Sequence, residues 1–155
     1  MEPRTGMKGR RTVAQFTIDA PAPDARGEER EFFERCQQGQ VPVQFCVACE
    51  RHVFYPRAVC PYCHGGPLAW REASGRGTIH TFTIQFRPPP GYGDEPYVTA
   101  MVELDEGVKM MSRIMATPEA VFVGQRVRAA FANIGAGVRV PVFVPTDDAS
   151  REELD

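Results

Sequence analysis

Four cysteines stand in two closely spaced pairs, and their spacing predicts a metal site. The pairs are Cys46-Val47-Ala48-Cys49 and Cys60-Pro61-Tyr62-Cys63, and ten residues separate them. Each C-x-x-C turn can aim two sulfurs at one point, so two such turns supply a tetrahedral shell of four thiolates. A shell of this kind leaves no open position for a substrate, and the metal would therefore be structural. Zinc is the expected metal, and iron bound in the same way is the alternative.

Other cysteine chemistry fits this chain less well. A disulfide framework is typical of small secreted proteins, but no apolar stretch of the kind found in a signal peptide follows Met1-Glu2-Pro3-Arg4. A redox C-x-x-C pair is expected beside a βαβ pattern, which neither pair has. The fifth cysteine, Cys36, falls outside the spacing on a predicted helix, where we expect a small, half-buried residue rather than a ligand or nucleophile.

The sequence shows no catalytic site of its own. Its three histidines are His52, His64 and His80, and His80 falls in a predicted strand, where it would pack at the edge of a core. There is no Gly-x-Ser-x-Gly elbow and no Walker loop. Acidic residues at 103–106 flank a predicted hairpin turn, where solvation accounts for them. We therefore expect a protein without turnover of its own.

The composition fits one main core with a small metal module. The chain has 155 residues, of which 43% are hydrophobic and 25% are charged, and its formal net charge is −2. No apolar run approaches the ~20 residues that a membrane-spanning helix needs. A cytoplasmic protein is the expectation.

The first segment of the chain, residues 1–27, is predicted to be a flexible arm. It holds a basic stretch at residues 8–11 and several prolines. Its apolar residues Val13, Phe16 and Ile18 could dock on a partner or on the core of the chain itself.

A helix and a metal-binding ribbon are predicted over residues 28–73. Between Glu28 and Gln38 the apolar residues, Phe32 and Phe33 among them, recur at helical spacing. The cysteine pairs follow, and residues 68–72 are expected to form the last strand of the ribbon.

Residues 74–146 show the period-two alternation of half-buried strands. Five strands are predicted, at residues 78–86, 97–104, 108–115, 125–131 and 138–144. The tight turn Asp105-Glu106-Gly107 joins the second to the third. Five short antiparallel strands predict a mainly β fold with a small Greek-key barrel, an OB-fold, rather than a β-sandwich, which needs about seven strands. Residues 147–155 are expected to be a tail.

The order of these parts resembles the DUF35 family, in which a rubredoxin-like zinc ribbon precedes an OB-fold. The resemblance covers about residues 28–145. Besides the two cysteine pairs, the motifs that carry it are Phe32-Phe33, Tyr55-Pro56-Arg57, Ser74-Gly75-Arg76-Gly77-Thr78, Pro96-Tyr97 and Val102-Glu103-Leu104-Asp105-Glu106-Gly107.

The resemblance implies an accessory role beside an enzyme. Members of the family act mostly as partner subunits of thiolase-fold enzymes or of hydratases that process acyl-CoA in lipid, sterol or aromatic-acid metabolism. We therefore expect a non-catalytic subunit of such a complex. Arg57 and Arg76 are the candidates for binding the phosphates of CoA, because arginine forks bind phosphate at two points; an ion pair between the domains is the alternative for both. The candidate partner-contact residues are Phe32, Phe33, Tyr55, Arg87 and Tyr92.

The alternative function is binding of single-stranded nucleic acid, which zinc ribbons and OB-folds can also perform. That function needs a basic groove with exposed aromatic residues. Between Gly77 and Val144, however, six lysines and arginines stand against six acidic residues. A balance of this kind favours a protein partner.

Overall fold

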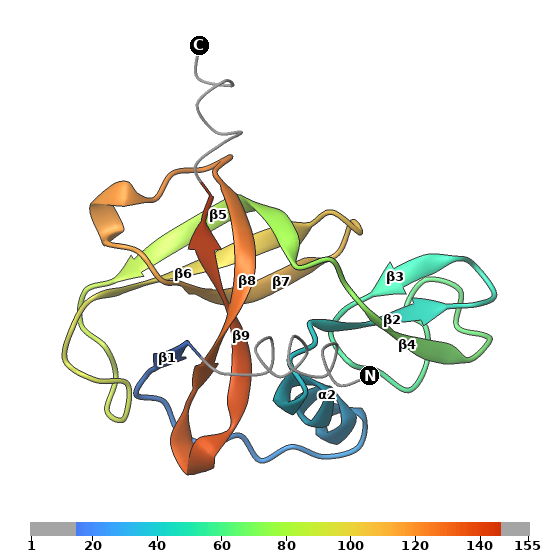
Figure 1. Cartoon of the computed structure of the whole chain (residues 1–155). Helices are drawn as coiled ribbons and strands as arrows, with labels where there is room; N and C mark the ends of the chain where they lie inside the picture. Colours follow the sequence, from blue (N-terminus) through green and yellow to red (C-terminus); the bar gives the residue numbers. More distant parts are fainter. Residues whose placement is uncertain (1–14, 147–155) are drawn as a thin grey trace, which may run out of the picture.

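The computed structural model describes residues 15–146. This part of the chain contains two β-sheets. The larger sheet closes into a barrel, and a three-stranded sheet extends from its side (Figure 1). The basic stretch at 8–11, Val13 and the predicted tail at 147–155 lie outside the described residues. Within the described residues, no helix is long and apolar enough to cross a membrane.

The larger sheet contains the five predicted barrel strands. They are β5 (Arg76–Gln85), β6 (Tyr97–Leu104), β7 (Lys109–Ile114), β8 (Arg126–Asn133) and β9 (Arg139–Pro145). The first three form an antiparallel meander, β9 returns beside β7 in parallel, and β8 closes the barrel between β9 and β5. This order is that of an OB-fold, so the predicted fold class is confirmed.

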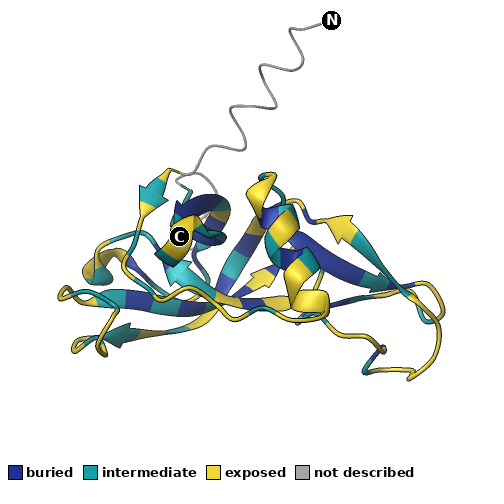
Figure 2. Cartoon of the chain, turned by 90° about the horizontal axis from the view of Figure 1, so that it is seen from below, coloured by how far each residue is buried: buried dark blue, intermediate teal, exposed yellow. Residues whose placement is uncertain are grey.

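The core follows from the alternation along the barrel strands. On β6, Val98, Ala100, Val102 and Leu104 point inward and are at most 1% exposed, and Figure 2 shows buried and more exposed residues alternating along the strands. Phe143 of β9 is fully buried in the same cluster. Val41, Val43 and Ala73, which lie at the base of the small sheet, also belong to this cluster. The two sheets therefore share one core.

A β-bulge in β5 changes which residues face the core. The register with β6 shifts between Ile79 and Thr81, so His80 is the extra residue. Ile79 is buried before the bulge, whereas Phe82 and Ile84 pack against the core after it. His80 is exposed, which corrects our expectation that it packs at a core edge.

The small sheet is the predicted ribbon. Its strands are β2 (Pro42–Cys46), β3 (Arg51–Val53) and β4 (Leu68–Glu72), with β2 in the centre. The helix α2 (Glu28–Gln37) precedes it and buries Phe32 and Cys36. Arg139 of β9 donates a hydrogen bond of 2.8 Å to the backbone carbonyl of Gln37, where the last turn of the helix leaves carbonyls free. The helix is thereby joined to the barrel.

The end of the N-terminal arm lies on the barrel, which differs from the flexible arm expected over residues 1–27. The short strand β1 (Phe16–Thr17) pairs in parallel with β8. Phe16 and Ile18 pack against a small cluster of buried residues on β8 and β9. Period-two alternation over two residues is too short a signal to be seen in the sequence. The sequence left open whether Phe16 and Ile18 dock on a partner or on the core of the chain, and the structure shows them docked on the chain itself.

Gly135→Ala should loosen this arm. The amide of Gly135 donates a 2.9 Å hydrogen bond to the carbonyl of Ala20, and a Cβ at Gly135 would lie 2.9 Å from Ala20 O and from Ala22 N. Relieving such a contact costs about 1–3 kcal/mol. Hydrogen–deuterium exchange should therefore rise in residues 15–22. Gly65→Ala is the matched control, since its Cβ would meet only a carbonyl at 4.0 Å. Unchanged exchange in the arm of the Gly135 variant would contradict the prediction.

Candidate metal centre and its surroundings

Two similar turns present the four cysteines. Cys46 ends β2, and the amide of Glu50 donates a 2.8 Å hydrogen bond back to its carbonyl. In the second turn the amide of His64 donates to the carbonyl of Cys60 at 3.0 Å. Glu50 and His64 have φ angles of 60° and 62°, so the residue after each pair adopts the left-handed conformation. The two knuckles thus have the same local geometry although their sequences differ.

The four sulfurs converge as a metal site requires. The Sγ atoms of Cys46, Cys49, Cys60 and Cys63 all lie within 4.8 Å of one another. Cys46 and Cys63 are 3.6 Å apart, and Cys49 and Cys60 are 3.7 Å apart. Zinc–sulfur bonds of about 2.3 Å in a tetrahedron place sulfurs about 3.8 Å apart. These residues therefore fit a four-thiolate metal site.

The surroundings act differently on the individual thiols. Burial favours the neutral thiol of Cys60, but hydrogen bonds from the backbone amides of Cys63 and Tyr62 and from the thiols of Cys46 and Cys49 together outweigh it and lower the pKa to about 6. At Cys49, burial and the neighbouring thiols raise the pKa to about 12. Four thiolates together carry more negative charge than this site holds without a cation, so metal binding and proton release are linked.

Cys36 is separate from this centre. It is fully buried in the helix α2, and burial raises the pKa of its thiol to about 12. A protonated, inaccessible thiol is a poor ligand and a poor nucleophile. The structure agrees with the expected packing role and shows a residue more deeply buried than we expected.

The structure places the two candidate phosphate-binding arginines on different sheets. Arg57 follows β3 in the ribbon, where the buried side chain of Gln44 accepts a hydrogen bond from its amide and donates one to its carbonyl, at 2.8 and 2.9 Å. Arg76 begins β5 of the barrel. Both side chains are exposed. No hydrogen bond or ion pair joins the two arginines within residues 15–146.

The candidate partner-contact residues are not all available at the surface. Phe32 is only 8% exposed and packs against Phe33 and Phe54, at 5.1 and 5.6 Å between ring centroids. Its expected partner contact is therefore corrected to a core role. Tyr55 remains 45% exposed, and Arg87 is also exposed.

The fifth candidate, Tyr92, lines a cleft of about 370 Å³ between the arm, the loop after β5 and the end of β7. In this cleft the guanidinium of Arg113 lies 3.7 Å from the centre of the Tyr97 ring. Burial lowers the pKa of Arg113. Asp19, Asp94 and Glu95 also line the cleft.

Sequence reasoning missed an apolar surface around the four cysteines. Val47, Val59 and Tyr62 are between 52% and 56% exposed, and each lies inside or directly beside a cysteine pair. Arg51 stacks on Tyr62, 4.7 Å from the ring centre. The sequence could have indicated this surface. Apolar residues at positions of a metal knuckle that face solvent cannot be buried in a core, so they remain exposed.

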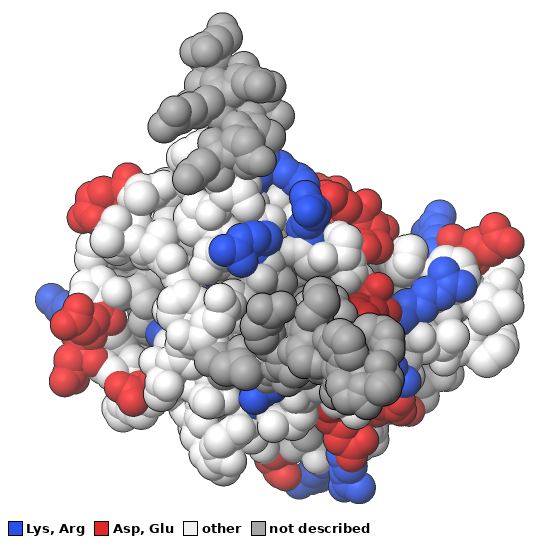
Figure 3. Space-filling view, viewed as in Figure 1, with Lys and Arg blue, Asp and Glu red and all other residues white. Residues whose placement is uncertain are grey.

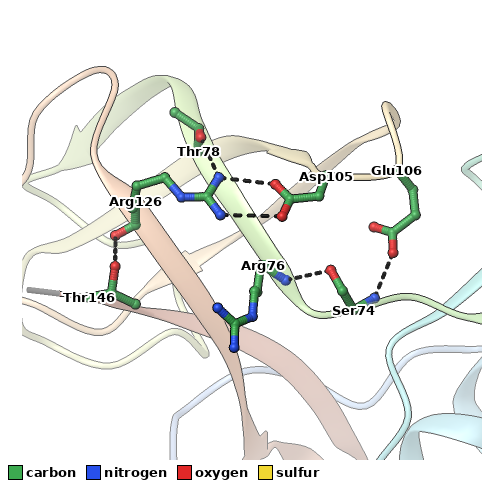
Figure 4. A network of polar contacts seen from close by, with 7 residues as sticks. All are labelled: Ser74, Arg76, Thr78, Asp105, Glu106, Arg126 and Thr146. Carbon is green, nitrogen blue, oxygen red and sulfur yellow. Dashed lines mark hydrogen bonds and ion pairs between the residues drawn. The ribbon is translucent and has the colours of Figure 1, made fainter. Parts of the chain in front are cut away.

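The acidic turn after β6 holds the junction between the two sheets, beyond the solvated role expected for it. Asp105 forms an ion pair with Arg126 of β8 at 3.0 Å. The Glu106 carboxylate accepts a 2.7 Å hydrogen bond from the amide of Ser74, and the hydroxyl of Ser74 accepts one of 3.1 Å from the amide of Arg76 (Figure 4). Glu106 thereby ties the end of the ribbon to the barrel.

Comparison with known proteins supports this architecture. Residues 33–69 match the family model of the rubredoxin-like zinc ribbon domain of ChsH2, and residues 70–132 match the model of its C-terminal OB-fold domain. A DUF35 domain-containing scaffold protein of Methanothermobacter thermautotrophicus is 34% identical over 92 residues, which are 57% of this chain and 69% of that protein. The chain belongs to the DUF35 family.

Two further relatives carry names of hydratase subunits. A probable enoyl-CoA hydratase alpha subunit of Thermomonospora curvata is 29% identical over 81% of this chain, which spans only 40% of that protein. The 3-oxo-4,17-pregnadiene-20-carboxyl-CoA hydratase alpha subunit of Mycobacterium tuberculosis is 38% identical over 42% of this chain and 21% of that protein.

Solved structures show the same fold. A chain of the Ltp2-ChsH2(DUF35) aldolase superposes with a TM-score of 0.73 at 27% identity, covering 80% of this chain and 98% of that one. A DUF35 protein of Sulfolobus solfataricus superposes with a TM-score of 0.54 at 14% identity, which shows likeness of fold alone.

Proposed function

We propose that this protein is a zinc-containing accessory subunit that binds a hydratase-, aldolase- or thiolase-type enzyme and helps to handle acyl-CoA thioesters. The observation that carries the proposal is the superposition on nearly the whole DUF35 chain of an aldolase assembly, at a TM-score of 0.73. The relatives named as hydratase alpha subunits support a partner that acts on CoA thioesters.

The metal centre supports a structural role. Four thiolates fill a tetrahedral shell, so a bound metal would have no position for a substrate. Zinc is proposed rather than iron because the ribbon matches a zinc ribbon family model. The metal would hold the two knuckles together and fix the surface around them.

The surface supports binding to another protein. Val47, Val59 and Tyr62 expose apolar area around the cysteines, where burial against a partner would stabilise a complex. Phe33, Tyr55, Arg87 and Tyr92 remain proposed contacts from the sequence. Arg57 and Arg76 are the proposed contacts for the phosphates of CoA.

The nucleic-acid alternative has weaker support. The outer face of β6 and β7 is the usual binding face of an OB-fold. Here Arg113 covers the ring of Tyr97 on that face. Further along the same two strands, Met101 and Met111 lie opposite each other. Stacking of bases needs free aromatic faces.

Co-expression with a hydratase-, aldolase- or thiolase-type enzyme from the same organism tests the proposal. We expect the two chains to co-elute from size exclusion at micromolar concentration, and we expect the isolated accessory chain to show no hydratase, aldolase or thiolase turnover. Independent elution together with salt-sensitive binding to single-stranded oligonucleotides would favour the nucleic-acid alternative. Turnover by the isolated chain would show that a catalytic site had been missed.

A further inference from the structure

Two arginines lie directly opposite each other on neighbouring strands of the barrel. Arg76 of β5 pairs with Arg128 of β8 in antiparallel register, and both side chains are exposed. Residues in this arrangement have Cβ atoms about 4.5–5.5 Å apart, so their side chains emerge together from one face. Like charges at that spacing destabilise a sheet unless an anion compensates them.

The nearby Arg126, by contrast, has its positive charge compensated by an acidic residue of the same chain. Arg126 donates to both carboxylate oxygens of Asp105, at 3.0 and 3.3 Å, and to the hydroxyl of Thr78 at 2.9 Å. The carboxylate of Asp105 is thereby engaged. Figure 4 shows the guanidinium of Arg76 directed away from this group, without a partner among the residues drawn.

Neither Arg76 nor Arg128 forms an ion pair with any acid in residues 15–146. Figure 3 shows basic side chains together in the upper middle of the view, over the β5, β8 and β9 region of Figure 1. Acidic side chains adjoin this group on its right in that view, and Asp105 pairs with Arg126 there. Within residues 15–146, Arg76 and Arg128 therefore present two guanidinium groups without an ion-pair partner on the same face of the sheet.

The backbone beneath the pair is held in place. The amide of Arg76 donates to Ser74 Oγ at 3.1 Å, and its carbonyl accepts a 2.9 Å hydrogen bond from the amide of Asp105. Next to Arg128, the amide of Ala129 donates to the carbonyl of Gly75 at 2.7 Å. An anion that binds both arginines would order side chains only and would not need a backbone change.

We propose that Arg76 and Arg128 together bind a phosphate group. A phosphate offers several oxygens, so each guanidinium fork can bind two of them without competing for the same position. The inference rests on the proposed function for the identity of the carrier, which would be a coenzyme A-type nucleotide with its 3′-phosphate or diphosphate on the pair. Arg128 is the residue that the sequence did not single out for this role.

Isothermal titration of the zinc-loaded full chain with coenzyme A is the test. We expect saturable binding that Arg76→Gln and Arg128→Gln each weaken about tenfold or more, the loss that corresponds to one hydrogen-bonded charged contact. Arg30→Gln is the matched control, because Arg30 is an exposed arginine on α2, away from this pair. Its affinity for coenzyme A should equal that of the unmodified chain.

Further ligands identify which phosphate is bound. If dephospho-coenzyme A binds more weakly than coenzyme A, the arginine pair holds the 3′-phosphate. If the two ligands bind equally well, the pair holds the diphosphate. Competition by inorganic phosphate that depends on Arg128 supports the site whatever the carrier. No binding of any of the three ligands, or binding that survives both substitutions, would overturn the proposal.

The partner assay separates this inference from the proposed function. Arg128→Gln should still co-elute with the enzyme, because the pair is assigned to the ligand. Loss of co-elution with unchanged affinity for coenzyme A would make the pair a docking contact and overturn the inference. If the chain binds phosphate through these arginines but binds no enzyme, the arginine-pair inference holds and the proposed function is wrong.

Discussion

Removing the metal should unfold the tip of the ribbon while the barrel stays folded. In structural zinc sites the free energy of metal binding is also folding free energy, about 10–16 kcal/mol in zinc-finger peptides. Cys60→Ser should therefore abolish tight metal binding and raise hydrogen–deuterium exchange across residues 46–68. The core around Phe143 is a separate cluster from the one at the ribbon tip that contains Cys46 and Cys60, so β5–β9 should keep their protection. The unmodified protein should contain about one zinc per chain by elemental analysis.

Cys36→Ala is the matched control for this result. It also removes one cysteine, but Cys36 lies outside the four-sulfur cluster, so the chain should keep its metal. Loss of protection in every barrel strand of Cys60→Ser would contradict the prediction and show that the ribbon and barrel unfold as one unit. Freshly purified protein with four free thiols and no metal would contradict the metal assignment itself.

Tyr62→Glu should weaken the complex with the partner enzyme by about thirtyfold or more. Buried tyrosines are frequent hot spots in interfaces, where truncation costs about 2 kcal/mol or more, and a carboxylate adds a desolvation cost. Tyr62 is 52% exposed beside the metal centre, and its backbone amide rather than its side chain contacts Cys60. The variant should therefore keep its zinc, which elemental analysis checks alongside affinity measured by interferometry.

Met111→Glu provides the comparison for Tyr62→Glu. Met111 is 55% exposed on the outer face of the barrel, so the two substitutions place a charge on equally accessible apolar residues. We expect the Met111 variant to bind the enzyme normally. The reverse result, with weak binding for Met111→Glu and normal binding for Tyr62→Glu, would move the interface from the ribbon to the barrel.

The sequence predicted the strands well because most of them obey a single physical rule. Period-two alternation places β6 and its neighbours with errors of one or two residues, and the cysteine spacing places the ribbon. The rule fails at His80, where a bulge inserts one residue and reverses the faces of β5. The bulge does break the alternation, because the apolar residues step by three from Ile79 to Phe82. That gap alone does not show which residue the pairing with β6 skips.

Features that depend on contacts between distant segments stayed out of reach for the same reason. Phe32 was named as a candidate partner contact because a short helix shows which residues are apolar but not what covers them. The opposition of Arg76 and Arg128 depends on the register of β5 against β8, which no local pattern specifies. The sequence did identify Arg76, but without its neighbour it gave only one half of a candidate site.

The turn between β6 and β7 has a mechanical consequence for the whole molecule. Its two carboxylates hold Ser74, at the base of the ribbon, and Arg126, on the barrel wall. A rotation of the ribbon about residues 73–75 would therefore break the hydrogen bond between Glu106 and Ser74. The distance from the cysteine cluster to the Arg76–Arg128 pair is therefore fixed. A partner that binds the tip of the ribbon would meet the two arginines at one distance and in one orientation.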